Sequence, residues 1–364
     1  MQQRNHLKQI LEATPKGEHF LYTDMAQALA GLSSARPAAI TLAGKPLPLE
    51  EPEADNETRL ATLDAIADTV VADPASPLYL DFLANAATPS GARLTLAAGT
   101  RADIAVHAPE GDDLRVQRLV VDVPSLASAD AVLRISSRSA LLLQLKVNIG
   151  QGASLRLVVL QDGLDDKRIL TRTTVDLQAH SRAELTYVNL DPQLARNEVK
   201  CAIHGAGADL RLNGLYVVAA DHTVDNETLV EHHAGHSSSS QLFKGIAHDN
   251  ARMAFGGLIL VKPDAQKTSA EQTNRHMLAS TTARAFAKPQ LEIYADDVKC
   301  SHGATTGQID PAQLFYMRQR GIDEATARRL LAAAFVGEVV DTIPFEDVKT
   351  SIRSRLTGQD EASL

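Results

Sequence analysis

The chain has 364 residues, with 36 Lys or Arg against 45 Asp or Glu, so its formal net charge is −9. This acidic balance argues against a nucleic-acid-binding function, because binding to phosphates needs clustered positive charge. Aromatic residues make up only 4% and Trp is absent, so Leu, Val, Ile and Ala must build the core. Two cysteines cannot form a disulfide framework, and no apolar run approaches the roughly 18 residues of a membrane span. We expect a cytoplasmic globular protein without a signal peptide.

Residues 1–88 are predicted to form an N-terminal helical region with a Pro-rich connector. Apolar residues recur near helical spacing over residues 1–35 and again over residues 60–71. Between these two segments, residues 36–60 contain four prolines and several acidic side chains, which are typical of an extended connector.

Residues 89–309 are predicted to form a β-rich core. Apolar and polar residues alternate with period two, as at Leu155 and Leu157, which is typical of strands with one buried face. About fifteen short strands are expected before residue 302. Repeats of 20–50 residues indicate solenoids, and small inward residues suit a narrow interior. We therefore expect a mainly β fold with a β-solenoid core, and an antiparallel sandwich is the alternative. A short motif, a turn followed by a strand, recurs along this region, and its alanines are Ala92, Ala153, Ala183, Ala208 and Ala251.

Residues 310–364 are predicted to form a C-terminal helical domain, with helices over 312–320, 324–340 and 343–356. Asp310 followed by proline, and Asp323, are signals for helix starts, and Gly321 is a signal for a helix end. The buried face of the second helix is expected to contain Ala327, Leu330, Leu331, Ala334 and Phe335.

One histidine-rich segment is a candidate metal site. His232, His233 and His236 bring three imidazoles within five residues, and imidazole is a common metal ligand. On a strand, His232 and His236 would share a face and His233 would point the other way. The spacing does not match a zinc-binding helix, so a polar outer surface is the alternative.

A second candidate metal site is formed by Cys300 and His302. On a strand both side chains project to the same face, about 6–7 Å apart. Thiolate and imidazole are usual ligands for iron, zinc and Fe–S clusters, but two ligands do not complete a site. Gly303 would permit a sharp exit from the strand. A buried cysteine beside a hydrogen-bonded histidine is the alternative. Cys201, in an alternating strand, is expected to be an inert core residue.

Catalytic signatures are weak or absent in this sequence. It contains no Walker lysine loop, no Gly-x-Ser-x-Gly elbow and no dinucleotide-binding fingerprint after a strand. A carbohydrate-acting enzyme with a β-helix fold is a candidate of another class, but such enzymes often use aromatic platforms, and this chain is poor in aromatic residues. We therefore expect a protein that is not an enzyme.

The stretch from Pro289 to Asp310, with Cys300-Ser-His-Gly-Ala-Thr at its centre, resembles the signature of the SufB/SufD family of Fe–S cluster assembly proteins. The segment Leu314–Ile322 is similar to the family as well. SufB-type proteins have Glu at the position of Gly303, so the resemblance favours the SufD branch. Further similar segments lie upstream, at His233-x-x-His236-Ser, Lys244-Gly-Ile and Val261-x-Pro-x-Ala-Gln-Lys-Thr268.

The resemblance implies a right-handed parallel β-helix between helical regions. It implies a non-catalytic subunit that pairs with SufB through the β-helix and with the ATPase SufC through the C-terminal helices, without nucleic-acid or membrane partners. His302 and Cys300 would contribute to iron or a nascent cluster at the partner interface. No cofactor is expected to bind stably to the chain alone. A SufB-like homodimeric scaffold is the alternative within the family. The partner-binding residues expected in the C-terminal helical domain are Phe315, Tyr316, Arg320 and Gly321.

Overall fold

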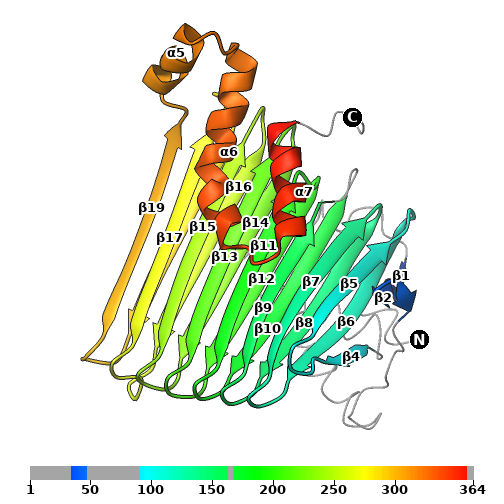
Figure 1. Ribbon diagram of the computed structural model, residues 1–364, viewed down its shortest axis with the longest axis vertical. Helices are drawn as coiled ribbons and strands as arrows, with labels where there is room; N and C mark the ends of the chain where they lie inside the picture. Colours follow the sequence, from blue (N-terminus) through cyan, green and yellow to red (C-terminus); the bar gives the residue numbers. More distant parts are fainter. Residues whose placement is uncertain (1–33, 47–90, 163–166, 359–364) are drawn as a thin grey trace.

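The computed structural model describes residues 34–46, 91–162 and 167–358 (Figure 1). In this part of the chain, two sheets face each other and form a β-solenoid of about seven coils, and three helices follow it. The pairings among strands β4 to β19 are all parallel, so the predicted β-solenoid is confirmed and an antiparallel sandwich is excluded. The helices expected within residues 1–33 and 47–88 lie outside the described residues.

Each coil contributes one strand to each sheet. The register offsets between successive strands of a sheet range from 26 residues, as from Arg168 to Leu194, to 32 residues, as from Arg252 to Arg284. The nine-stranded sheet contains β1 (Ser34–Pro37), β4 (Ala92–Thr95), β6 (Asp113–Val123), β8 (Ala140–Ile149), β10 (Arg168–Leu177), β12 (Leu194–Ile203), β14 (Thr223–His232), β16 (Arg252–Val261) and β18 (Arg284–Ile293). The ten-stranded sheet contains β2 (Ala39–Leu42), β3 (Lys45–Pro46), β5 (Arg101–Ala108), β7 (Ser128–Ser137), β9 (Ser154–Gln161), β11 (Arg182–Leu190), β13 (Asp209–Val218), β15 (Ser238–Ala247), β17 (Ser269–Leu278) and β19 (Lys299–Gln308).

The first three strands differ from the sequence-based expectation. Residues 34 and 35 were expected in a helix and residues 36–46 in a connector, but β1 pairs with β6, and β2 pairs antiparallel with β5 and β3. The prolines of this segment stand at the ends of β1 and β3, and strand ends and sheet edges tolerate the missing N–H. These short strands therefore extend both sheets at the N-terminal end of the solenoid.

The interior of the solenoid is filled by the inward-facing residues of both sheets, mostly Leu, Val, Ile and Ala. The five alanines of the repeated phrase are all buried. They do not form one column, because Ala183 pairs with Leu155 and Leu210, whereas Ala153 and Ala208 stand one position before β9 and β13. At one corner Gly207 adopts φ +73°, and the ring of His180 occupies the space that a Cβ would take there.

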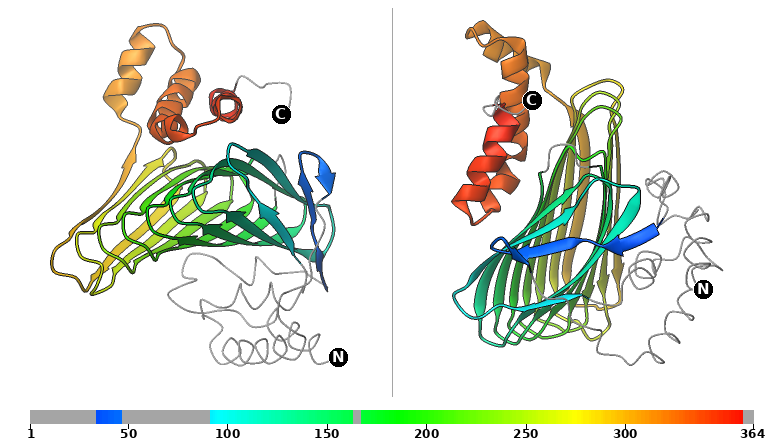
Figure 2. Two further views of the ribbon diagram at one scale, coloured as in Figure 1. Left: turned by 60° about the horizontal axis from the view of Figure 1, so that its bottom comes forward. Right: turned by 90° about the vertical axis from the view of Figure 1, so that its right-hand side faces the viewer.

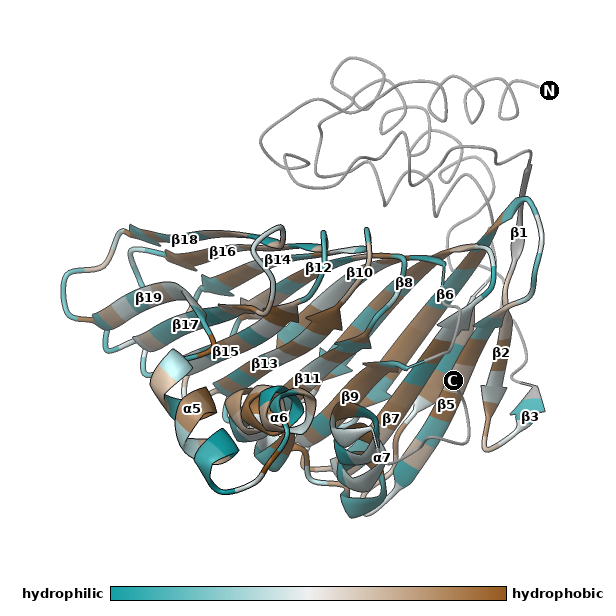
Figure 3. Ribbon diagram, turned by 90° about the horizontal axis from the view of Figure 1, so that it is seen from above, coloured by the Kyte–Doolittle hydropathy of each residue, from teal (hydrophilic) through white to brown (hydrophobic). Residues whose placement is uncertain are grey.

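Helices α5 (Pro311–Gln319), α6 (Glu324–Thr342) and α7 (Glu346–Thr357) complete the described chain. Asp310 and Asp323 cap α5 and α6 as predicted, because each carboxylate accepts a backbone N–H of the first turn. The third helix begins three residues later than expected, after Pro344. Helices α6 and α7 lie over the outer face of the ten-stranded sheet (Figures 2 and 3).

The packing of α6 corrects the face that the sequence predicted. Its buried residues are Ala327, Val336, Val339 and Val340, whereas Leu330 and Ala334 are exposed. The C-terminal half of α6 packs against outward-facing apolar residues of the sheet, so the position of the sheet selects the buried face. Lys244 of β15 secures this contact, because its ammonium lies 2.5 Å from a carboxylate oxygen of Glu338 and donates to the carbonyl of Phe335.

Candidate functional site at the open end of the β-solenoid

The solenoid ends with β18 and β19, and we call these two strands and the interior between them the open end. Within the described residues, β18 pairs only with β16, and β19 only with β17. Nine of the ten residues of β19 are exposed, whereas the inward residues of the preceding coils are buried. The outer edge of β19 therefore presents backbone N–H and C=O groups that another strand can pair with.

The structure places Cys300 and His302 on the same, inward face of β19, as the sequence predicted. Cys300 is the register partner of the buried Ala270, and His302 is that of the buried Gln272. Gly303 does not end the strand, because β19 continues straight through it to Gln308. The expected sharp exit at Gly303 is therefore wrong, and its missing side chain instead leaves open space on the strand.

The two candidate ligands have different surroundings. Cys300 is half-buried against a small apolar cluster that includes Ala270 and Ala295, and burial raises the pKa of its thiol. The thiol is therefore protonated at neutral pH in the isolated chain, and it can bind a metal only with loss of that proton. His302 is exposed at the rim of the interior. Cys201, in contrast, is fully buried, and burial raises the pKa of its thiol to about 12, which confirms an inert core residue.

The inward face of β17 carries polar residues that the sequence-based reasoning missed. Gln272, Asn274 and His276 are all buried there, directly beneath β19. Tyr216 bridges two of them, since its hydroxyl accepts the amide N–H of Asn274 at 3.0 Å and lies 2.6 Å from Nε2 of His276. The alternation in this strand would have revealed them, because its inward positions are polar where earlier strands have Leu or Val.

The histidines of the other candidate metal site are not brought together. Strand β14 ends at His232, so His232 and His236 do not share a strand face. His232 is buried and both of its ring nitrogens are used, at 2.8 Å from the hydroxyls of Ser237 and Ser239. Burial lowers the pKa of His232 to about 4, so its ring is neutral.

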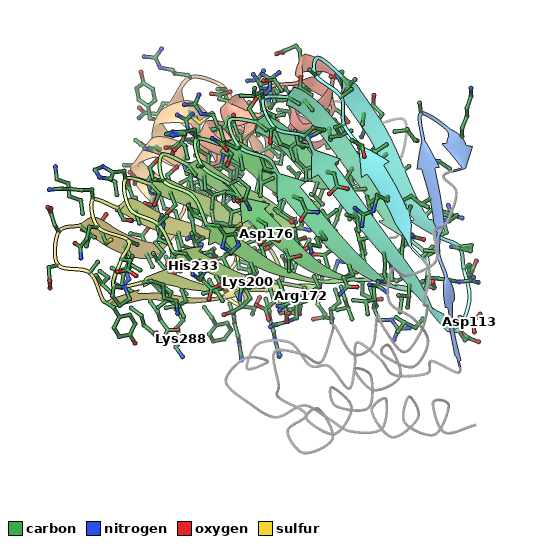
Figure 4. The ribbon with its side chains drawn as sticks, turned by 90° about the horizontal axis from the view of Figure 1, so that it is seen from below. Asp113, Arg172, Asp176, Lys200, His233 and Lys288 are labelled. Carbon is green, nitrogen blue, oxygen red and sulfur yellow. The ribbon has the colours of Figure 1, made fainter. Side chains whose placement is uncertain are left out.

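The other two histidines of this segment lie outside the interior. His233 stacks on His204 with ring centroids 5.1 Å apart and lies 3.6 Å from Glu231, close to Asp176 and Lys200 (Figure 4). His236 stands in a turn with φ +54°. Across the described part of the chain, no group of three or more His, Cys, Asp or Glu side chains is arranged to hold a metal ion. Cys300 and His302 thus form at most part of a site.

The comparisons with known proteins decide the family. The family model described as "SUF system FeS cluster assembly, SufBD core domain" matches residues 106–335, more than half of the chain. The chain belongs to the SufBD family. The matched residues include the solenoid from β6 to β19, together with α5 and most of α6.

Individual relatives agree with this assignment. The chain is 40% identical to the iron-sulfur cluster assembly protein SufD of Escherichia coli over 161 residues, which are 44% of this chain and 38% of that protein. It is 37% identical to SufD of Bacillus subtilis over 139 residues, 38% of this chain and 32% of that protein. It is 34% identical to the Arabidopsis thaliana protein "ABCI7, chloroplastic" over 217 residues, 59% of this chain and 45% of that protein. The chain therefore spans less than half the length of these curated relatives.

The SufBD-family chain also carries an exposed surface on α5. None of the residues of this helix is buried, and Phe315 and Tyr316 are 60% and 55% exposed. The guanidinium of Arg320 lies over the ring of Tyr316, 4.5 Å from its centroid, and Gly321 ends the helix with φ +84°.

Among the described helices, none is long and apolar enough to cross a membrane.

Proposed function

We propose that this chain is a non-catalytic, SufD-type scaffold subunit of an Fe–S cluster assembly complex. In this proposal a SufB-type subunit pairs with the open end of the solenoid, and a SufC-type ATPase binds the C-terminal helices. Iron and the nascent cluster are bound as cargo between the two solenoids. The chain acts in the cytoplasm, although the Arabidopsis relative is named as chloroplastic.

The single observation that carries this proposal is the placement of Cys300 and His302 on an edge strand. In the described chain β19 lacks a neighbour on its outer side, and an unpaired strand edge readily binds another chain. The exposed residues Ile293 and Tyr294 at the end of β18 add apolar surface beside it. A partner that covers this edge also closes the interior above His302.

The chemistry of the two ligands explains why a partner is needed. One thiol and one imidazole fill two positions of an iron site that commonly has four. The remaining ligands must come from the partner or from sulfide, because no further His, Cys, Asp or Glu in the described part of the chain completes the set. Because the pKa of the Cys300 thiol is raised, the thiol is protonated before iron binds. Iron binding displaces this proton.

The surface of α5 supports the proposed contact with the ATPase. Phe315 and Tyr316 are exposed neighbours, and Arg320 lies over the ring of Tyr316. Aromatic residues and Arg are the residue types that dominate protein interfaces. Helices α6 and α7 belong to the packed fold, since their apolar residues cover the outer face of the ten-stranded sheet. The proposed docking surface is therefore α5 and the turn that follows it.

The test uses the complex reconstituted from this chain and the SufB-type and SufC-type proteins of the same organism. His302→Ala should abolish most of the cluster assembled anaerobically from iron and sulfide, measured by visible absorbance. Thr306→Ala is the matched control, because Thr306 lies on the same inward face of the same strand and is also exposed. An unchanged cluster yield with His302→Ala would contradict the ligand role.

A further inference from the structure

One row of side chains changes its chemistry as it approaches the open end. Register pairing places Leu185, Leu212, Gln241, Gln272 and His302 side by side on the inward face of β11, β13, β15, β17 and β19. The row is apolar in the middle of the solenoid and consists of two amides followed by an imidazole at its end. Neighbouring strands are about 4.8 Å apart, so a change of side-chain rotamer can bring the Gln272 amide to the His302 ring.

Gln272 is fully buried and unsatisfied. Neither its amide oxygen nor its amide nitrogen has a hydrogen-bond partner among the described residues. The amide nitrogen lies against Gly257 of the opposite sheet, where a Cβ would stand only 2.3 Å from it. A buried amide without partners is destabilising by about 1–3 kcal/mol, so a hydrogen bond that Gln272 gains when a neighbouring side chain reorients is favourable.

The neighbours of Gln272 leave its oxygen available. The amide oxygen of Gln241, the preceding residue of the row, accepts a hydrogen bond from the hydroxyl of Thr228 at 2.8 Å, whereas its amide nitrogen has no partner in the described structure. Asn274 is two residues further along the inward face of β17, and its Oδ1 also lacks a partner in the described structure. If the Gln272 side chain changes rotamer, its amide N–H can donate to this oxygen, and the Gln272 oxygen would then face His302.

A metal-bound imidazole needs a hydrogen-bond acceptor for its second ring nitrogen, and the Gln272 oxygen can be that acceptor. When one ring nitrogen binds the metal, the other carries a proton, and a hydrogen bond from that N–H fixes the tautomer and the orientation of the ring. We propose that Gln272 is the positioning residue for His302, with its amide oxygen accepting the imidazole N–H so that the other ring nitrogen is free for iron. This inference rests on the proposed function, in which His302 binds iron.

The experiment measures Fe²⁺ affinity by anaerobic equilibrium titration of the reconstituted complex, together with its melting temperature. Gln272→Leu should weaken Fe²⁺ binding 10- to 100-fold, as is typical for loss of a partner of a metal ligand. Its melting temperature should stay the same or rise, because an unsatisfied buried amide is replaced by an apolar side chain. Gln272→Glu keeps an acceptor at the same place and should bind Fe²⁺ within about threefold of the wild type.

Three controls separate positioning from general packing. Gln241→Leu, in the same row but one strand further from His302, should change the affinity by less than about threefold. Gln272→Met, which is unbranched like Gln, repeats the test if the Leu variant does not fold. In a His302→Ala background, Gln272→Leu should cause no further loss, because the residue acts only through the imidazole.

The outcomes are distinct for the two proposals. If His302→Ala weakens Fe²⁺ binding but both Gln272→Leu and Gln272→Met bind like the wild type, the positioning role is refuted and the proposed function stands. Equal losses with and without His302 also refute positioning. If His302→Ala itself leaves the affinity unchanged, His302 is not an iron ligand and both proposals fail at this residue.

Discussion

The middle of the solenoid and its open end share one backbone geometry but differ in side-chain chemistry. Strands β13 and β19 each have ten residues and belong to the same ten-stranded sheet. In the row described above, the middle position is the fully buried Leu212 and the end position is the exposed His302. In a solenoid each coil contacts mainly its neighbours, so an interior coil is covered on both sides and a terminal coil on one. The middle coils therefore contribute most of the folding stability, and residues of the terminal coil can serve ligand binding at little cost in stability.

The largest expected difference between the two regions is in folding stability. Leu212→Ala should lower the free energy of unfolding by about 2–5 kcal/mol, because it leaves a cavity between two covered coils. Thr306→Ala, also on the inward face but at the open end, should change it by less than about 0.5 kcal/mol. Urea denaturation of both variants measures the difference, and similar losses would remove the distinction between the regions.

The burial of His232 makes folding stability depend on pH. Burial lowers the pKa of His232 to about 4 in the folded protein, below the usual 6.5 of the unfolded chain. The unfolded state therefore binds more protons between these values, and the stability associated with the neutral ring is present above pH 6.5 and lost as the pH falls towards 4. The loss should amount to about 3 kcal/mol.

The pH dependence is isolated by comparing variants. His232→Gln should reduce the slope of the stability profile between pH 6.5 and 4, measured by chemical denaturation at several pH values. The slope should not vanish, because burial lowers the pKa of His276 to about 4 as well. An identical slope in wild type and His232→Gln would show that His232 is not held in the neutral form.

Substitution of the two cysteines should change the free energy of unfolding by different amounts, with a smaller difference than in the predictions above. Cys201→Ser places a hydroxyl in the apolar interior and should lower the free energy of unfolding by about 1–3 kcal/mol. Cys300→Ser lies at the open end and should lower it by less than about 0.5 kcal/mol. Thermal unfolding of the two single variants tests this, and a larger loss from Cys300→Ser would mean that Cys300 is a structural residue.

The smallest effect on folding is expected for α5. The double variant Phe315→Ala/Tyr316→Ala should leave stability within about 0.5 kcal/mol, because both rings are exposed. Its affinity for the SufC-type ATPase should fall at least about tenfold, since aromatic anchors dominate interfaces. Calorimetric titration measures this, with Gln313→Ala on the same helix as the control. Unchanged affinity in the double variant would move the proposed docking surface elsewhere.

Local patterns allowed much of the fold to be predicted. The alternation at Leu155 and Leu157 indicates strands because side-chain direction on a strand depends only on the chain itself. The cap at Asp323 is local in the same way. The buried face of α6 was partly wrong, because the neighbouring sheet determines which residues, Val336 rather than Leu330, are covered.

The candidate site was only partly predictable for a similar reason. The shared face of Cys300 and His302 follows from their spacing, but their place at the end of the solenoid depends on how many coils precede them. Gln272 is an ordinary polar residue in the sequence. It becomes notable only once the register places it inside, beside His302.

The most direct test of this account is hydrogen exchange at the backbone amides of β19. The chain should be compared alone and in complex with the SufB-type subunit. We predict that the amides of residues 299–308 become markedly protected on complex formation, while those of β13 are protected already and change little. Equal exchange of β19 in the free and bound chain would contradict the claim that a partner completes the open end.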